Sequence, residues 1–275
     1  MNQQIEKTAV VQDPLIPLAR DLRKAAETLS DIEARYLVDY YYQVQNGRIR
    51  ACNQVQAQES EPHEVVAWLA DNTRRLENNI KSALGIYAKA SPVGRWSLSI
   101  TGIGPVLAAG LLCHIDVTDR PTVGRIWKFA GLDPTTEWGK GEKRPWNAQL
   151  KTLCWKIGES FVKVSGRESD FYGKIWATRK KIEEEKNERG DFSDQAKAKL
   201  KKFKIGKDTD AYKCYAAGKL PPAHIHARAK RYAVKLFLSH WHHVAYCEKY
   251  SEKPPKPYII AIGGHAGFVG PPGYP

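Results

Sequence analysis

The chain has 275 residues, with 43 Lys and Arg against 30 Asp and Glu, so its formal net charge is +13. A chain of this length can bury a core in one or two domains, and 42% hydrophobic with 27% charged residues excludes a disordered chain. The longest apolar stretch, residues 105–115, is much shorter than the roughly 20 residues of a membrane span. The first residues also lack the apolar segment of a secretory signal. We therefore expect a cytoplasmic protein with no membrane partner.

The positive charge is confined to one part of the chain. Residues 1–90 contain 11 basic and 12 acidic residues, a net charge of −1, whereas residues 91–275 contain 32 basic and 18 acidic residues, a net charge of +14. A basic region beside a neutral one is typical of a protein that binds a polyanion. A solvated surface that happens to be basic would give the same count, so charge alone leaves both interpretations open.

Two long amphipathic helices are predicted before residue 91. Apolar residues at three- and four-residue spacing run from Pro14 to about Gln56, and again from Glu64 to Lys89. The polar break between them is short, so the helices should pack as an antiparallel hairpin, a coiled-coil arm over residues 1–91. Aromatic residues on several faces, such as Tyr36, would leave a surface for a further helix. We therefore expect homo-oligomerisation through this arm.

Shorter helices are predicted over residues 92–250. No period-two alternation is long enough for a sheet, so the fold class is all-α, and Asn147 should cap one of the helices. A Lys-rich insertion of short, mobile helices should occupy about 191–219, and the Pro- and Gly-rich tail, residues 251–275, should be extended. One expected helix ends near residue 100. The others lie at residues 105–115, 122–130, 148–165, 169–189 and 222–250.

The most specific motif is Thr101-Gly102-Ile103-Gly104-Pro105, followed by Ala108 and Ala109. It has the form of a helix-hairpin-helix, in which the glycines permit a sharp turn and the alanines permit close helix packing. Free amides and the positive dipole end at the start of the Pro105 helix suit a DNA phosphate, a contact to the backbone and not to bases. The alternative is a tight turn with only a structural role.

Three segments together resemble a known family. The run SITGIGPVLAAGLLCHID, then RIWKFAGLDP and the later helix ARAKRYAVKLFL, resemble the C-terminal half of insertion-sequence transposases whose N-terminal half is a RuvC-like, DEDD-type nuclease domain. The two long helices resemble the coiled coil that joins the halves in that family. The resemblance spans roughly residues 15–250 and is specific over about 95–135. It implies a helical DNA-binding module used in transposition or recombination, in some members together with a guide RNA, so that RNA is a second expected partner.

The catalytic parts of that family are not found in this sequence. No segment before the helical hairpin has alternating strands with acidic residues at their ends. The family carries a serine nucleophile in a Ser-Gly pair soon after a G-L-x-P segment, but here residues 131–134 (GLDP) are followed by Trp138-Gly139. An indole cannot attack a phosphodiester, and Ser165 lies beyond the next helix. We therefore predict no catalytic residue in this chain.

We predict neither a metal site nor a cofactor. His240, His243 and Cys247 share one helix face, but three ligand-type residues on one helix are weak evidence for a metal, and packed core residues are the favoured interpretation. The 5 cysteines are scattered without a C-x-x-C pair, which indicates neither a disulfide framework nor a zinc ribbon.

Basic residues near these motifs complete the predicted DNA-binding surface. The loop between Trp138 and Trp146 combines cations with indoles, which suits phosphates and exposed bases, although both indoles could instead anchor the loop. The Lys-rich run 197–207 would add only non-specific, salt-dependent affinity. The predicted DNA-binding residues are Thr101, Gly102, Ile103, Gly104, Pro105, Arg125, Lys128, Lys140, Lys143, Arg144, Arg228, Lys230 and Arg231.

Three functions fit these observations. The leading hypothesis is a DNA-binding protein of the transposase C-terminal type that has no catalytic centre of its own. The second is a transposase or recombinase subunit that is active alone or with a separately encoded nuclease. The third is a protein-interaction scaffold in which the glycine turn is only structural.

Overall fold

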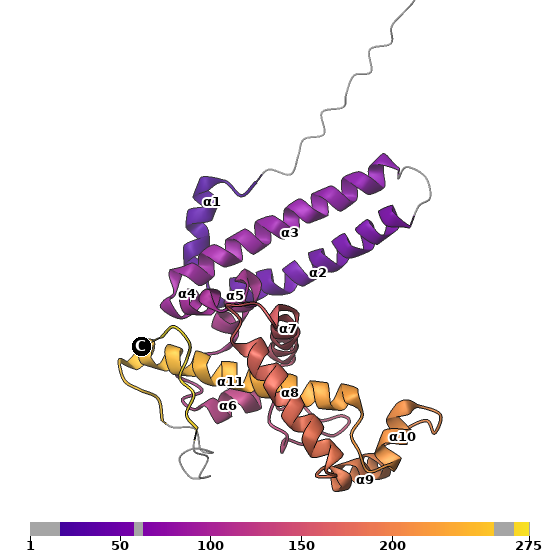
Figure 1. Ribbon diagram of the computed structural model, residues 1–275. Helices are drawn as coiled ribbons and strands as arrows, with labels where there is room; N and C mark the ends of the chain where they lie inside the picture. The colour runs from indigo at the N-terminus through magenta and orange to yellow at the C-terminus, as the bar shows by residue number, and fades with distance from the viewer. Residues whose placement is uncertain (1–16, 58–62, 256–266, 275) are drawn as a thin grey trace, which may run out of the picture. The chain divides into compact units, whose positions relative to one another are not determined.

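The computed structural model describes residues 17–57, 63–255 and 267–274, and these residues form helices, turns and loops with no strand (Figure 1). The predicted all-α class is therefore confirmed. The chain divides into two compact units, residues 1–87 and 88–275. In the described part of the chain, no helix is long and apolar enough to cross a membrane.

The first unit holds helix α1 (Arg20–Ala25), the 3-10 turn η1 (Ala26–Thr28), helix α2 (Asp31–Gln56) and most of helix α3 (Glu64–Ala90). The prediction of one helix from Pro14 to Gln56 was wrong over its described part, because the helical chain stops at Leu29 and starts again at Asp31. Ser30 caps α2: its hydroxyl accepts the Glu33 N–H, and the Glu33 carboxylate accepts the Ser30 N–H at 2.8 Å. This reciprocal capping box fixes a new helix start at Ser30. Residues 14–16 lie outside the described part.

Helices α2 and α3 are antiparallel. Near the start of α2, Asp31 accepts a hydrogen bond of 2.8 Å from Tyr87, near the end of α3. Further along α2, Tyr41 donates to Glu77 at 3.0 Å, and Arg48 forms an ion pair with the same carboxylate. The polar contacts flank buried apolar residues on both helices, so a mixed apolar and polar seam holds the pair together.

Eight helices belong wholly to the second unit, within its described residues. Their bounds are α4 (Pro92–Ser99), α5 (Pro105–His114), α6 (Val123–Phe129), α7 (Ala148–Val164), α8 (Tyr172–Glu188), α9 (Ser193–Lys202), α10 (Asp210–Ala216) and α11 (Pro222–Tyr250). Asn147 caps α7 as predicted, because its side chain accepts the Leu150 N–H at 2.9 Å. Helix α8 begins at Tyr172 and not at Ser169, because the Asp170 carboxylate accepts the Gly173 N–H at 2.8 Å and ends the preceding turn there.

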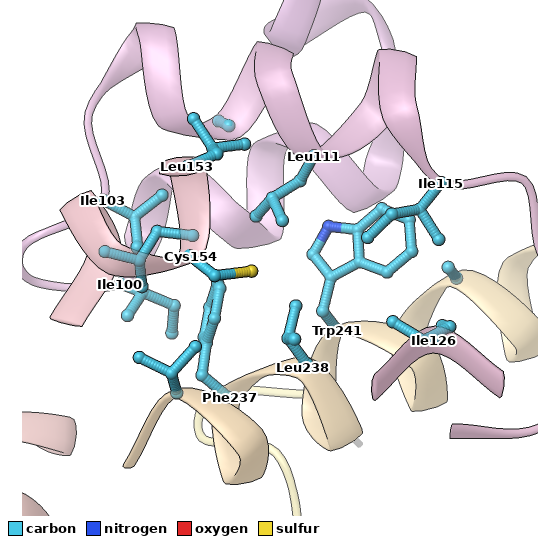
Figure 2. Packing of buried hydrophobic residues seen from close by; sticks show 14 of the residues in the cluster. Ile100, Ile103, Leu111, Ile115, Ile126, Leu153, Cys154, Phe237, Leu238 and Trp241 are labelled. Carbon is cyan, nitrogen blue, oxygen red and sulfur yellow. The ribbon is translucent and has the colours of Figure 1, made fainter. Parts of the chain in front are cut away.

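The core of the second unit is built on α11, which packs against α4, α6, α7 and α8. Figure 2 shows Trp241 of α11 beside Leu111 and Ile115 of the α5 segment, and Phe237 of α11 on the side of Cys154 of α7. Their side chains are at most 4% exposed. The last predicted helix is therefore the central one, and its buried face fixes which of its basic residues can face outward.

The Lys-rich insertion forms the short helices α9 and α10. Phe192, Ala196, Leu220 and Ile225 make a small apolar cluster that connects this part to the start of α11. Short helices were expected here, and the structure places them on a core cluster of their own.

His240 is a packed core residue. Its Nδ1 accepts a hydrogen bond of 2.7 Å from the Tyr172 hydroxyl, and its Nε2 donates to the Val269 carbonyl at 2.8 Å in the tail. Both ring nitrogens are thus bonded within the protein. Among the residues that the structure describes, no group of three His, Cys, Asp or Glu side chains could hold a metal ion.

Candidate nucleic-acid interface

The turn between α4 and α5 is packed tightly on its Gly102 side. Gly102 has a φ of +98°, and a Cβ there would lie 3.2 Å from Val164 and 3.3 Å from Ser160 of α7. The Ser160 hydroxyl donates to the Gly102 carbonyl, and the neighbouring Ile103 is buried. Glycine is needed here for a left-handed backbone and for the close approach to α7.

The same turn is open on its Gly104 side. Gly104 has an extended backbone (φ −93°, ψ 176°), and a Cβ added there would meet nothing within 4 Å. No side chain caps α5, and Pro105 has no N–H, so the Val106 and Leu107 amides have no partner within the helix. The Thr101 side chain is engaged elsewhere, because its hydroxyl donates a hydrogen bond of 3.0 Å to the Ser169 hydroxyl. Gly104 therefore marks the accessible, electropositive side of the turn.

The loop before α7 is folded back on itself. Trp138 donates its indole N–H to the Glu142 carbonyl at 2.8 Å, and the Trp138 and Trp146 rings meet edge to face at 6.0 Å. At the end of the loop, the Asn147 N–H donates to the Phe129 carbonyl at 2.9 Å. Both indoles thus help to anchor the loop, although Trp138 remains 42% exposed.

Three cations from three separate segments lie near this loop: Arg144 is 5.3 Å from the Trp138 ring centroid, Lys151 of α7 is 4.0 Å from the Trp146 ring centroid, and Arg231 of α11 is close enough for its charge to act on Lys151. The pKa of the Lys151 ammonium is lowered by its burial and then by the charges of Arg144 and Arg231. None of the ion pairs among the described residues involves these three side chains. We call these three residues the cation cluster. Their mutual repulsion is what a bound anion would relieve.

Two neighbouring basic residues of α11 have internal partners. Arg228 pairs with Glu183 at 2.8 Å and donates to Gln195 at 3.1 Å. Burial disfavours the charged form of Glu183, but hydrogen bonds and charge from Arg228 and Arg179 outweigh it and hold the pKa of Glu183 below its ordinary value. Lys230 pairs with Glu159. We therefore leave Arg228 and Lys230 out of the cation cluster.

The remaining predicted cations are exposed at the surface. Arg125 and Lys128 lie three residues apart on α6, and Lys140 and Lys143 lie in the loop. No ion pair of the described residues includes any of the four. They add exposed positive charge to α6 and the loop and are not part of the cation cluster.

Helix α7 separates the turn from the cation cluster. An α-helix rotates by about 100° and rises about 1.5 Å per residue, so Ser160 lies about half a turn around the axis from Lys151 and roughly 14 Å along it. Gly102 packs against Ser160, on the side of α7 away from Lys151. The predicted site residues therefore form two separate candidate contacts, and the structure does not bring them into one.

Lys151 was missed by the sequence reasoning. It follows the predicted N-cap Asn147 by one helical turn and lies outside the apolar face of α7, so its position near the loop was available from helix geometry. The proximity of Lys151 to Arg231 could not be predicted from the sequence, because it depends on how α7 packs on α11.

These features define an all-helical protein in which a glycine turn, a basic loop and α7 form one continuous segment. Residues 97–167, which contain all three, match the model of the Transposase IS116/IS110/IS902 family, so the chain is a transposase-related protein. The match ends before α11 and therefore includes Arg144 and Lys151 but not Arg231. No curated protein and no solved structure matches the chain.

Proposed function

We propose that this transposase-related protein binds the phosphate backbone of DNA in transposition or recombination. The observation that carries the proposal is that Arg144 and Lys151 lie over the neighbouring Trp138 and Trp146 rings, with the charge of Arg231 nearby, and that none of these three cations forms an ion pair in the described residues. Holding like charges together is unfavourable unless an anion is present for part of the protein's cycle. DNA suits such a cluster because each phosphate that it neutralises releases condensed counterions.

Binding of this kind would be largely independent of sequence. Lysine and arginine contacts to phosphates position a protein on DNA without reading base edges. The net charge of +14 on residues 91–275 extends the attraction beyond the cluster itself. We propose the open Gly104 side of the turn as a second backbone contact, on the other side of α7, as a helix-hairpin-helix would supply.

We further propose that this chain contributes DNA binding and not strand cleavage. Trp138 stands at the place where the resembled family has a serine nucleophile, and its indole N–H is bonded to the Glu142 carbonyl. The match to a transposase family favours a second candidate, a subunit that cleaves DNA together with a separate nuclease. Nicking of supercoiled plasmid by the purified protein with Mg²⁺ would establish cleavage by this chain and contradict the proposal.

Self-association through the first unit is part of the proposal. Large apolar side chains are exposed near the start of α2, where Ile32 is 76% and Tyr36 is 65% exposed, and near the start of α3, where Trp68 is 44% exposed. Patches of this kind favour association with another apolar surface. A monomer in sedimentation at micromolar concentration would contradict it.

The DNA-binding proposal is tested by fluorescence anisotropy with a labelled duplex of arbitrary sequence. At about 50 mM salt we expect saturable binding, and at about 200 mM salt we expect much weaker binding. A second duplex of unrelated sequence should bind with the same affinity. Absence of binding at low salt would refute the proposal.

A further inference from the structure

Trp155 is a large indole on the polar face of α7. It is 59% exposed, more than Trp138 or Trp68. It lies one helical turn after Lys151 of the cation cluster and one turn before Glu159. A large exposed aromatic beside a cluster of cations is the combination that proteins use to hold unpaired nucleotides.

The surroundings of Trp155 position the ring without covering it. Gly158 lets α7 approach α11 closely, since a Cβ there would lie 3.6 Å from the Cβ of Lys230. Lys230 therefore reaches across to pair with Glu159, and its ammonium lies 5.8 Å from the Trp155 ring centroid. The Lys230 ammonium lies over the ring at this distance, and more than half of Trp155 remains exposed to solvent.

Other indoles of this region are already covered. A lysine ammonium lies 4.0 Å from the ring centroid of Trp127 and of Trp146. Trp96 stacks on Phe237 in the core, with the ring centroids 6.0 Å apart. Trp155 differs from these three because it is 59% exposed, and the cation described over its ring, Lys230, lies at 5.8 Å, against 4.0 Å for the lysines over Trp127 and Trp146.

We infer that Trp155 is a stacking platform for an unpaired base whose neighbouring phosphate is held by the cation cluster. Four residues, about 6 Å along the axis of α7, separate Lys151 from Trp155, which suits a base and an adjacent phosphate. The bases of an intact duplex are already stacked on each other and expose only their edges, so a duplex gains nothing from this ring. The preferred substrate is therefore DNA with unpaired nucleotides, an inference that rests on the proposed DNA binding.

The test compares labelled oligo-dT of about 20 nucleotides with a duplex of the same length, for the wild type and three variants. Trp155→Leu keeps an apolar side chain but removes the aromatic face, Trp155→Phe restores a smaller face, and Tyr250→Leu, at an exposed aromatic residue in the last turn of α11, is the control. We expect Trp155→Leu to bind oligo-dT roughly 5- to 100-fold more weakly and to bind duplex as the wild type does. Trp155→Phe should recover much of the loss, and Tyr250→Leu should show none.

The two proposals fail in different ways. Equal oligo-dT affinity of the wild type and Trp155→Leu, with intact duplex binding, overturns the platform and leaves DNA binding standing. An equal loss on oligo-dT and duplex also overturns it, because the indole would then act only through packing. A wild type that binds neither DNA overturns both proposals. Because Trp155 is exposed, circular dichroism should show unchanged helix content in both variants.

Discussion

Arg228 and Arg231 lie three residues apart on α11, and their replacement by glutamine should have opposite consequences. The Glu183 carboxylate is only 2% exposed and is shared by Arg228 and Arg179, each at 2.8 Å. Arg228→Gln leaves this buried carboxylate with one of its two cations. A hydrogen bond to a charged group contributes about 1.5–3 kcal/mol, so the free energy of unfolding should fall by about 2 kcal/mol.

Arg231→Gln should leave stability almost unchanged and weaken DNA binding. Arg231 is exposed and has no ion pair in the described residues, so we expect a stability change within about 0.5 kcal/mol. One phosphate contact contributes about 0.9 to the salt slope, so its loss should remove roughly a 3.5-fold change in affinity between about 50 and 200 mM salt.

The assay combines urea unfolding, followed by circular dichroism, with anisotropy on duplex DNA for both variants. Arg228→Gln should shift the urea midpoint and keep the wild-type affinity while folded, whereas Arg231→Gln should do the reverse. An unchanged midpoint for Arg228→Gln, with lost DNA affinity, would refute the assignment of Arg228 to the interior.

Three further predictions concern the turn and the buried histidines. Gly102→Ala should lower the free energy of unfolding by about 1–2 kcal/mol, because Gly102 has a positive φ and lies against α7. Gly104→Ala should change the free energy of unfolding by less than about 0.5 kcal/mol, because a Cβ there meets no neighbour. Equal effects of the two variants in urea unfolding would contradict this contrast. Gly104→Glu should bind duplex DNA more weakly than its neutral control Gly104→Gln, and equal affinities would show that no phosphate lies near the turn. Burial lowers the pKa of His224, His240 and His242 from 6.5 to about 4. The neutral histidines therefore contribute their full stability above pH 6.5 and lose it as the pH falls towards 4. Within this range each group should lower the free energy of unfolding by about 1.4 kcal/mol per pH unit. Unfolding free energies that are equal at about pH 7 and about pH 5 would contradict this last prediction.

Helix α7 shows how much of the fold could be predicted from the sequence. Its apolar residues recur at helical spacing, and Asn147 precedes them with a side chain that caps the first turn, so both the helix and its start were predictable. The break before α2 was missed, because the apolar stripe continues across Ser30 and hides it. The Ser30-x-x-Glu33 capping box was present in the sequence as a local signal for that break.

The candidate site was less predictable because its charges are paired or left unpaired by contacts between distant residues. Glu183 and Arg228 are 45 positions apart, and nothing local distinguishes Arg228 from Arg231. Arg228 meets a carboxylate because α8, which carries Glu183, packs on α11, whereas Arg231 of the same helix forms no ion pair in the described residues. Composition located the charge in residues 91–275, and only the packed helices showed which side chains remain free to bind an anion.

The central claim is that the cation cluster binds DNA phosphates, and the salt dependence of duplex affinity tests it most directly. The variant carries Arg144→Gln, Lys151→Gln and Arg231→Gln. Its control carries three substitutions with the same loss of charge on exposed residues of the first unit, Arg50→Gln, Arg75→Gln and Lys81→Gln. Three lost phosphate contacts should reduce the magnitude of the slope of log affinity against log salt by about 2.7, so the ratio of wild-type to variant affinity should be about 40-fold larger at about 50 mM than at about 200 mM salt. The control should keep the wild-type slope, and an equal slope in the wild type and the cluster variant would contradict the account.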